Sequence, residues 1–417
     1  MLDIGQIHRT EYELEYDRSI TGGRRASKAR RMSNQKFDGG PVVIAEAPGR
    51  IHLLGEHGDP AFGYFLSAAI DRYIKVAVNM RKDNSFRFYA PDLGERKRST
   101  LVNLKFRRED RWANYLKTAV FVFYEMGVPM KGLNFSFCGD IPQQAGLASS
   151  TAIEAAAAAA LRVLFHVQIS DVNLARKLME THARLFNETA ALADYELCLM
   201  ARKDQFMIID VFADEIIKIK SPLSRFRFLL VDSRVPHIGA QREIASRKAD
   251  TQKGLALLSQ KHDGVCFKDF ASVDLIESLG AFPEHIRRRS MHIVEEIRRV
   301  NDACDALQRS DIASLARIIY HSHESLRDLY EISCPEVDWL VKRAQEIEGA
   351  AGSRMTGQGF GGCTYTIIRK ELVEEYKKRL EDYERIFGFK PAIYEVKLAA
   401  GAKVIPERRR AYAHIAD

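Results

Sequence analysis

The stretch from Ala47 to Asp59, APGRIHLLGEHGD, concentrates side chains that can do chemistry. Arg50 supplies a guanidinium group, and Glu56, His57 and Asp59 supply acceptors for hydroxyl groups. A polyol bound beside a phosphate needs this combination, because neighbouring hydroxyls need paired acceptors and a transferred phosphoryl group needs a fixed cation. The alternative is a solvated turn with an ordinary surface ion pair, and this segment alone does not exclude it.

A second candidate site lies in PQQAGLASSTAIEAAAAAALRVLF, which begins at Pro142. Gly146 and Leu147 precede two hydroxyl residues, Ser149 and Ser150, and a run of alanines follows. Serine is favoured at a helix N-terminus and alanine is the best helix former, so a helix is expected to start here. Its free N–H groups and dipole would attract a phosphate. The pattern is neither a P-loop nor a dinucleotide fingerprint, and a packed alanine-rich core helix is an equally good interpretation.

A third segment, TGQGFGGC at Thr356–Cys363, is rich in glycine. Glycines such as Gly359 and Gly361 suit a tight turn where the backbone approaches a ligand or another loop. A glycine-rich hairpin without a ligand is the alternative.

The elements that must position these segments follow from the apolar pattern and from helix signals. A strand is expected at Val42–Ala45, and a helix is expected to begin near Ser149. Further expectations are a helix near Val172–Met200, a strand at Phe226–Val231, helices near Pro283–Ala306 and Asp311–Leu329, and strands on both sides of the glycine-rich turn. This mixture predicts an α+β protein with one domain from Asp38 to about Asp210 and a second from about Lys220.

The composition narrows the class of protein. The chain has 417 residues and 46% hydrophobic content, enough for about two or three packed domains. No apolar run approaches a membrane span and the N-terminus has no apolar signal core, so a cytoplasmic protein is expected. The six cysteines are scattered without a CxxC pair, which favours reduced thiols over disulfides or a zinc site.

The net charge is +7, and basic residues gather near both ends of the chain, at positions 24–31 and 408–410. Nucleic-acid binding is one interpretation of such clusters. A solvated surface with a mobile arm is the preferred one, because no aromatic residues interleave with the charges.

Together and in this order, the three segments resemble the GHMP small-molecule kinases, and within them the galactokinases. The resemblance runs from about Pro41 onward. Two further segments resemble family blocks, WANYLK at Trp112–Lys117 and ESLRDLYEISCPEVDWLV at Glu324–Val341. So do GLASS in the second segment and GFGGCT at Gly359–Thr364, which overlaps the third. The resemblance implies a two-lobed fold with the active site in the cleft between the lobes. It divides the chain into an N-terminal extension (1–38), an N-terminal domain (39–215) and a C-terminal domain (216–417).

The resemblance also implies an activity, the ATP-dependent phosphorylation of a sugar hydroxyl, with the C1 hydroxyl of galactose or a related sugar as acceptor. ATP would be the co-substrate, with Mg²⁺ as the metal. The implied roles are Asp194 and Arg50 in catalysis; Glu56, His57, Asp59 and Arg242 in sugar binding; Pro142, Gly146, Leu147, Ser149, Ser150, Gly359 and Gly361 in ATP binding; and Ser150 in metal binding. Sugar and ATP are the expected partners, without membrane or nucleic acid, and the oligomeric state stays open.

Asp194 is assigned as the base by register. The family segment Gly-Ile-Met-Asp-Gln aligns with residues 191–195, and the alignment continues without a gap to the strand Ile208–Asp210. Asp204 also begins an Asp-Gln-Phe sequence, but it lies too close to that strand. An ordinary acid on an exposed helix face is the alternative for Asp194.

The chain also departs from the family pattern. The positions that differ are Pro60, Ala61, Gln144, Ala148, His182, Ala191 and Arg242, of which His182 aligns with a metal-ligand glutamate. A galactokinase-like regulator or pseudokinase is therefore a second hypothesis, and a kinase for another small alcohol is a third. Retention of Arg50 and Asp194 favours the active sugar kinase.

Overall fold

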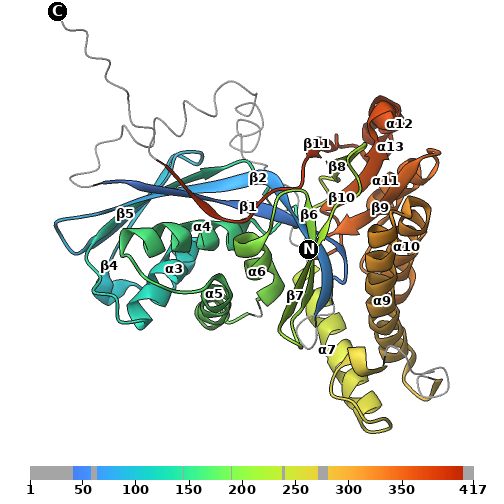
Figure 1. The fold of residues 1–417 in the computed structure, drawn as a ribbon, viewed down its shortest axis with the longest axis horizontal. Helices are drawn as coiled ribbons and strands as arrows, with labels where there is room; N and C mark the ends of the chain where they lie inside the picture. Colours follow the sequence, from blue (N-terminus) through green and yellow to red (C-terminus); the bar gives the residue numbers. More distant parts are fainter. Residues whose placement is uncertain are drawn as a thin grey trace, which may run out of the picture.

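The computed structural model describes residues 41–57, 63–143, 145–188, 190–236, 240–270 and 280–406 (Figure 1). The predicted N-terminal extension, both basic clusters, Asp59 and Gln144 lie outside these ranges.

The first lobe is built on an eight-stranded sheet with the order β12-β1-β2-β5-β3-β4, to which β6 adds beside β2 and β7 beside β6. The strands are β1 (Val43–Leu54), β2 (Tyr64–Met80), β3 (Ser85–Ala90), β4 (Glu95–Thr100), β5 (Leu133–Gly139), β6 (Gln205–Asp210), β7 (Glu215–Lys220) and β12 (Lys403–Ile405). All pairs are antiparallel except β3 with β5. The long β1–β2 pair is therefore the frame that carries the sugar turn.

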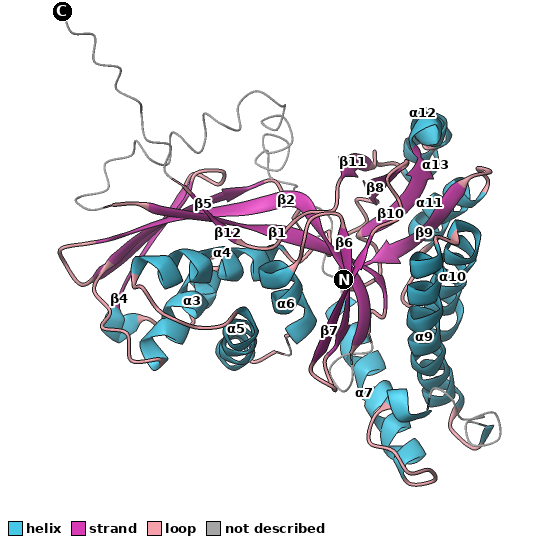
Figure 2. Cartoon of the chain, viewed as in Figure 1, coloured by secondary structure: helices cyan, strands magenta, loops and turns pink. Residues whose placement is uncertain are grey.

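Four helices cover one face of this sheet (Figure 2). They are α3 (Ala113–Glu125), α4 (Ser149–Leu164), α5 (Asp171–Phe186) and α6 (Leu192–Met200). The alanines at positions 155–160 of α4 are buried, and α4 packs on both β1 and β2. Small side chains allow this close approach, so the N-terminus of α4 is held firmly against β1.

The second lobe has a four-stranded antiparallel sheet with the order β11-β8-β10-β9. Its strands are β8 (Phe226–Asp232), β9 (Ala350–Thr356), β10 (Cys363–Arg369) and β11 (Ala392–Val396). Its helices are α7 (Ala240–Ser259), α9 (Glu284–Arg309), α10 (Ile312–Ser325), α11 (Pro335–Gln345), α12 (Val373–Arg379) and α13 (Tyr383–Phe387). Short helical turns complete the chain: η1 (Leu101–Asn103), η2 (Arg108–Asp110), η3 (Phe267–Phe270), the π-helical η4 (Leu326–Tyr330) and η5 (Lys370–Leu372).

The predicted α+β class is confirmed, as are β8, α9 and the start of α4. The single helix predicted near Val172–Met200 was wrong, because the chain forms α5 and α6 with a break between them. Asn187 ends α5 in the left-handed region, with φ 53°, which is a conformation that Asn tolerates well. The break is important because it makes residue 192 a new helix start.

The strand pairing departs from the predicted domain boundary at residue 216 in two places. β7 spans that boundary and stays in the first sheet through its hairpin with β6. β12 returns from the C-terminal part of the chain to pair with β1. Backbone hydrogen bonding therefore ties both segments to the first lobe.

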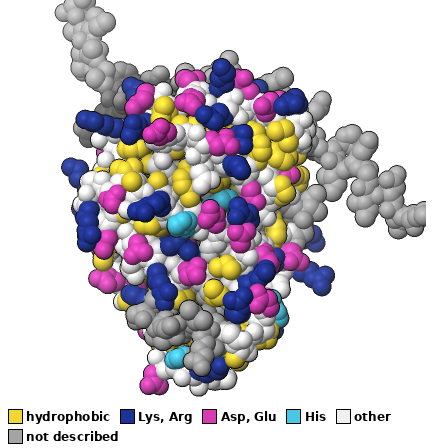
Figure 3. Space-filling model, turned by 90° about the vertical axis from the view of Figure 1, so that its right-hand side faces the viewer, with side chains coloured by type: hydrophobic (Ala, Val, Ile, Leu, Met, Phe, Trp, Pro, Cys, Tyr) yellow, Lys and Arg dark blue, Asp and Glu magenta, His cyan; other side chains and the backbone are white. Residues whose placement is uncertain are grey.

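Within the described residues, no helix is long and apolar enough to cross a membrane. All six cysteines are free thiols, and five of them are buried. Acidic and basic side chains are interspersed over the face shown in Figure 3.

Candidate active site

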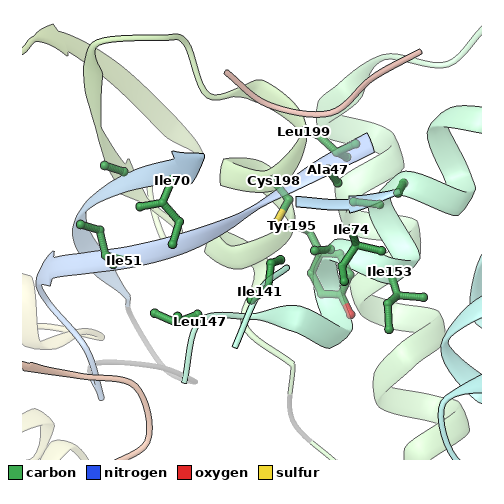
Figure 4. Close-up of a cluster of buried hydrophobic side chains, with 14 of the residues drawn as sticks. Ala47, Ile51, Ile70, Ile74, Ile141, Leu147, Ile153, Tyr195, Cys198 and Leu199 are labelled. Atoms are coloured by element: carbon green, nitrogen blue, oxygen red, sulfur yellow. The ribbon is translucent and has the colours of Figure 1, made fainter. Parts of the chain in front are cut away.

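An apolar cluster fixes the position of α6 against β1 (Figure 4). Tyr195 and Cys198 of α6 are buried, and the Cys198 thiol lies 3.3 Å from the carbonyl oxygen of Pro48. The Tyr195 hydroxyl donates to Glu154 of α4 at 2.7 Å. Asp194 precedes this anchored tyrosine, so its backbone is fixed by the core behind it.

Arg50 of β1 and Asp194 of α6 form a paired ion contact. Arg50 Nε lies 2.6 Å from Asp194 Oδ1, and Arg50 Nη2 lies 3.0 Å from Asp194 Oδ2. The side chains are 11% and 14% exposed, so the pair is mostly shielded while retaining access to solvent. Two parallel N–H···O contacts fix the orientation of the carboxylate as well as its charge.

The surroundings of Asp194 keep it ionised. Burial acts to raise the pKa of Asp194, but the charge of Arg50 and a hydrogen bond from His52 outweigh burial and hold the pKa well below its usual range. Asp194 also lies in the first turn of α6, where the helix dipole favours a negative charge. The carboxylate can therefore accept a proton but has none to give at neutral pH.

The two oxygens of Asp194 are not equivalent. Oδ1 accepts from Arg50 Nε and from His52 Nε2, which lies 3.0 Å away. Oδ2 accepts from Arg50 Nη2, and the described residues supply it with no second donor. Because each carboxylate oxygen has two lone pairs, Oδ2 has the capacity to accept one more hydrogen bond.

Arg50 also connects this carboxylate to the segment around Gly146. Its Nη1 donates to the Gly146 carbonyl oxygen at 2.7 Å, and its backbone N–H donates to the Leu147 carbonyl oxygen at 3.1 Å. One arginine therefore fixes the distance between the candidate base and the candidate phosphate loop.

The phosphate loop leads directly into α4. Ala148 adopts φ 59° and ψ 42°, the left-handed region, and provides no side-chain cap for the helix. A left-handed residue other than glycine costs about 1–2 kcal/mol, and such strain is concentrated at functional sites. The first N–H groups of α4, beside Ser149 and Ser150, have no acceptor within the helix. This N-terminus is suited to bind an anion.

The glycine-rich loop contacts the phosphate loop from the second lobe. A Cβ added to Gly146 would lie 2.7 Å from the Cα of Gly357, and both residues have a left-handed φ. The two backbones meet at a distance that only glycine permits. Gly359 and Gly361 pack against Ile332 and Val235 respectively, so their small size has a packing reason within the chain.

Glu56 is buried and turned toward the second lobe. It accepts hydrogen bonds from Arg354 Nη1 at 2.7 Å, from the Thr356 hydroxyl at 3.2 Å and from the Gly357 backbone N–H. Its side chain is 5% exposed. Protein donors therefore occupy most of the capacity that the sequence analysis assigned to sugar hydroxyls.

Arg354 of β9 had no role in the sequence analysis. Its side chain is fully buried, and besides Glu56 it contacts Glu296 of α9 at 3.3 Å and Ser322 of α10 at 2.8 Å. The backbone N–H of Gly55 donates to the same Glu296 at 3.0 Å. These contacts tie the turn after β1 to three elements of the second lobe.

His57, the residue after Glu56, has a backbone φ of 71°, in the left-handed region. Burial, assisted by the charges of Arg354 and Lys248, lowers the pKa of His57 to about 3, so the imidazole is neutral at physiological pH. Its Nε2 is buried and has no hydrogen-bond partner among the described residues. Its ring lies 5.1 Å from that of Tyr330. An unsatisfied buried nitrogen of this kind suits a ligand hydroxyl.

The predicted sugar residue Arg242 lies exposed in the first turn of α7. The cation of α7 whose charge affects the pKa of His57 is Lys248, which also affects the pKa of Glu188 in the first lobe. Lys248 is thus a cation of α7 whose charge acts on residues of the first lobe, and the sequence analysis assigned it no role.

The residues around His182 do not fit a protein-built Mg²⁺ site. Its Nδ1 lies 2.7 Å from Glu154, and its Nε2 lies 3.1 Å from Glu188. Burial alone would lower the pKa of His182, but these two hydrogen bonds raise it to about 9. An imidazolium has no lone pair for a metal. Within the described residues, no group of three or more His, Cys, Asp or Glu side chains could hold a metal ion.

Comparison with known protein families gives three matches in chain order. Residues 34–80 match the galactokinase galactose-binding signature, residues 114–202 the N-terminal domain of GHMP kinases, and residues 303–385 the GHMP kinase C-terminal domain. The three candidate segments and the family blocks named in the sequence analysis lie in or beside these ranges.

Relatives and solved structures agree with these matches. A protein of Treponema pallidum (strain Nichols) is 36% identical over 94% of this chain and 100% of its own length. The galactokinase of Roseiflexus sp. (strain RS-1) is 31% identical over 89% of this chain and 95% of its own.

The crystal structure of Lactococcus lactis galactokinase complexed with galactose covers 91% of this chain and 99% of its own, at 24% identity and a TM-score of 0.83. Methanococcus jannaschii mevalonate kinase, at 18% identity, covers 86% and 99% with a TM-score of 0.60. The two-lobed fold and the predicted family are confirmed, and the chain belongs to the galactokinases, a family of GHMP kinases.

Proposed function

We propose that this chain transfers the γ-phosphoryl group of ATP to a monosaccharide hydroxyl, with the C1 hydroxyl of galactose or a related sugar as acceptor. The observation that carries this proposal is the spare acceptor capacity of Asp194 Oδ2, next to an arginine that also contacts the Gly146 carbonyl. Phosphoryl transfer depends mainly on positioning and charge neutralisation, and these residues supply both.

The reaction would proceed with the sugar hydroxyl donating to Asp194 Oδ2. As the hydroxyl oxygen bonds to the γ-phosphorus, its proton passes to the carboxylate and the bond to the β-phosphate oxygen breaks, releasing ADP. Three of the five N–H groups of Arg50 are engaged by Asp194 and Gly146. The remaining two, together with the N-terminus of α4, would offset charge on the transferring group.

Sugar recognition would rest on neutral and charged groups of the turn after β1. His57 Nε2 offers a buried nitrogen for a hydroxyl, and Lys248 supplies a cation nearby. Asp59 completes the proposed set, whereas the exposed Arg242 is left out of it. Glu56 would act mainly by holding this turn against the second lobe, since its oxygens accept from Arg354, Thr356 and Gly357. The relative crystallised with galactose makes that sugar the first to test.

Mg²⁺ would reach the site on the phosphates of ATP, because this metal is often held by substrate phosphates and few protein groups. Ser150, at the start of α4, is its proposed protein ligand. A cytoplasmic location, with sugar and ATP as the only partners, completes the proposal.

The experiment is an ATP-coupled assay over a panel of monosaccharides that includes galactose, its epimers and uronic acids. We expect ATP- and sugar-dependent ADP release that is lost in Asp194→Asn. Release of ADP that does not depend on any sugar, or that persists fully in the variant, would contradict the proposal.

A sugar- and ATP-binding regulator with little turnover is the second candidate. Two observations favour it. His182 aligns with a metal-ligand glutamate of the family but is a cation paired with Glu154 and Glu188. The carboxylate of Glu56 accepts a hydrogen bond from Arg354 of the second lobe. Calorimetric binding of a sugar and of an ATP analogue, without turnover of any sugar in the panel, would support this candidate over the kinase.

A further inference from the structure

A histidine lies directly behind the candidate base. His52 Nε2 is 3.0 Å from Asp194 Oδ1, and His52 Nδ1 is 2.6 Å from the hydroxyl oxygen of Ser67. His52 is 2% exposed and Ser67 is 0% exposed. The three side chains form one continuous chain of hydrogen bonds from β2 through β1 to α6.

The strand register places these groups opposite one another. His52 of β1 pairs directly with Ser67 of β2. Side chains at paired positions on neighbouring antiparallel strands lie within contact distance, so the sheet itself fixes the His52–Ser67 contact. Phe65 packs against the imidazole with a ring-centre distance of 4.8 Å. The ring therefore has little freedom to turn away from Asp194.

The hydrogen-bond partners of His52 determine which of its ring nitrogens carries a proton. An ionised carboxylate can only accept, so His52 Nε2 must carry the hydrogen that points at Asp194 Oδ1. In the neutral imidazole the other nitrogen is an acceptor, so Nδ1 accepts from the Ser67 hydroxyl. The groups that act on His52 are Arg50 and Glu56 from the β1 side, Ser67 from β2 and Asp194 from α6. Burial, followed by the charge of Arg50, lowers the pKa of His52, in agreement with this neutral tautomer.

We propose that His52 is a positioning residue for the phosphoryl-transfer reaction. By donating to Asp194 Oδ1, His52 leaves Oδ2 to receive the proton of the acceptor hydroxyl. Ser67 holds the tautomer that makes this possible. The inference rests on the proposed function, because it assigns the part played by a residue behind the base. Without His52, Oδ1 would lose one of its two donors, and the paired contact with Arg50 would have to hold the orientation of the carboxylate alone.

The test compares His52→Leu with His52→Gln. Leucine fills similar space without a donor, whereas the glutamine amide nitrogen is as many bonds from Cα as imidazole Nε2 and can donate to Oδ1. We expect His52→Leu to lower kcat by about tenfold or more, the effect of losing one hydrogen bond to a charged group. The KM values for sugar and ATP should stay within about threefold of wild type, and His52→Gln should restore most of kcat.

The pH profile gives a second readout. The hydrogen bond from His52 helps to lower the pKa of Asp194, so its loss should move the acid limb of kcat to higher pH in His52→Leu but not in His52→Gln. Ser67→Ala should have a smaller effect in the same direction. A general loss of packing would not shift this limb.

The matched control is His323 of α10, which is also 2% exposed and has Nε2 3.2 Å from a carboxylate, that of Asp338. His323→Leu should lower the unfolding temperature without changing the acid limb of kcat. Equal kcat in His52→Leu and wild type, or failure of His52→Gln to restore kcat while the protein remains folded, would overturn the proposal.

One measurement separates this inference from the proposed function. In protein labelled with ¹⁵N-histidine, the nitrogen shifts report the tautomer of His52 whether or not any sugar is phosphorylated. We expect a neutral ring protonated at Nε2. A ring protonated at Nδ1, or at both nitrogens at neutral pH, would overturn the inference, whereas an inactive protein with the expected tautomer would refute only the kinase activity.

Discussion

Two carboxylates, one buried and one partly exposed, lie within reach of the same arginine, and their surroundings differ. Asp194 shares two hydrogen bonds with Arg50, whereas Glu56 lies 3.8 Å from Arg50 Nη1. Oδ2 of Asp194 keeps capacity for another donor among the described residues. Glu56 accepts from Arg354 and Gly357 of the second lobe.

This contrast shows that residue type and burial do not by themselves identify a reactive carboxylate. What distinguishes Asp194 is the acceptor capacity that the described residues leave unused on Oδ2. Glu56 uses its capacity to hold the turn after β1 against β9. One carboxylate is therefore suited to chemistry and the other to the joining of the lobes.

The largest expected effect comes from Asp194→Asn. The substitution removes the negative charge and the proton acceptor, so kcat should fall by about 10²–10⁴-fold, the usual contribution of acid–base catalysis. Calorimetry should find ATP affinity close to that of wild type. A variant that keeps near-wild-type kcat would remove Asp194 from the role of base.

Glu56→Gln should instead affect stability. Removal of the Glu56 charge leaves the buried Arg354 with Glu296 as its remaining charged partner, and breaking a buried ion pair costs up to about 3–5 kcal/mol. Urea unfolding measures this loss. The matched control is Glu284→Gln, since Glu284 pairs with Arg287 and Arg288 but is 59% exposed.

An exposed pair contributes at most about 1 kcal/mol, so the control should unfold nearly as wild type does. If Glu56→Gln is as stable as wild type but has a sharply raised sugar KM, Glu56 binds the sugar and does not serve mainly to hold the two lobes together.

A second structural ion pair, that of His182 with Glu154 and Glu188, predicts a pH dependence of stability. The pKa of His182 is raised to about 9 in the folded protein, from 6.5 in the unfolded chain. Its stabilising contribution is therefore complete below about pH 6.5 and is lost as the pH rises through 9. We expect a loss on the order of 2–3 kcal/mol over this window.

The measurement is the free energy of unfolding of wild type and His182→Gln at pH 6.5 and pH 9. Comparison with the variant removes the contribution of other titrating groups. Parallel pH profiles for the two proteins would show that His182 is not charged in the folded state.

The smallest expected effect separates two cations of α7. Lys248 acts on the pKa of His57, whereas Arg242 is exposed, so Lys248→Ala should raise the sugar KM by about threefold and Arg242→Ala should leave it unchanged. Steady-state kinetics with saturating ATP measures both. A raised KM in Arg242→Ala alone would return that residue to the sugar pocket.

Local patterns in the sequence predicted most of the fold. Short apolar runs identified β8, and alanine propensity behind Ser149 identified α4. Register was the basis for choosing Asp194, and the structure brings its carboxylate against Arg50, while its role as base stays a prediction. The break between α5 and α6 was missed, since Asn187 ends α5 through a left-handed backbone that helix propensity alone does not reveal.

The partners of buried polar residues could not be predicted in this way. His52 and Asp194 are 142 residues apart in the chain, and Glu56 and Arg354 are 298 residues apart. Their contacts depend on strand register and on how the lobes meet, which no local pattern encodes. For this reason Glu56 was taken as a sugar ligand, while Arg354 received no role.

The most direct test of the two carboxylates is a crystal structure of the chain with a phosphorylatable sugar and a non-hydrolysable ATP analogue. The quantity to measure is the distance from the attacking hydroxyl oxygen to each carboxylate oxygen. We expect this hydroxyl within hydrogen-bond distance of Asp194 Oδ2, at about 2.5–3.0 Å, with Glu56 still bound to Arg354 and Gly357. An attacking hydroxyl bound to Glu56, with Arg354 displaced, would contradict the account.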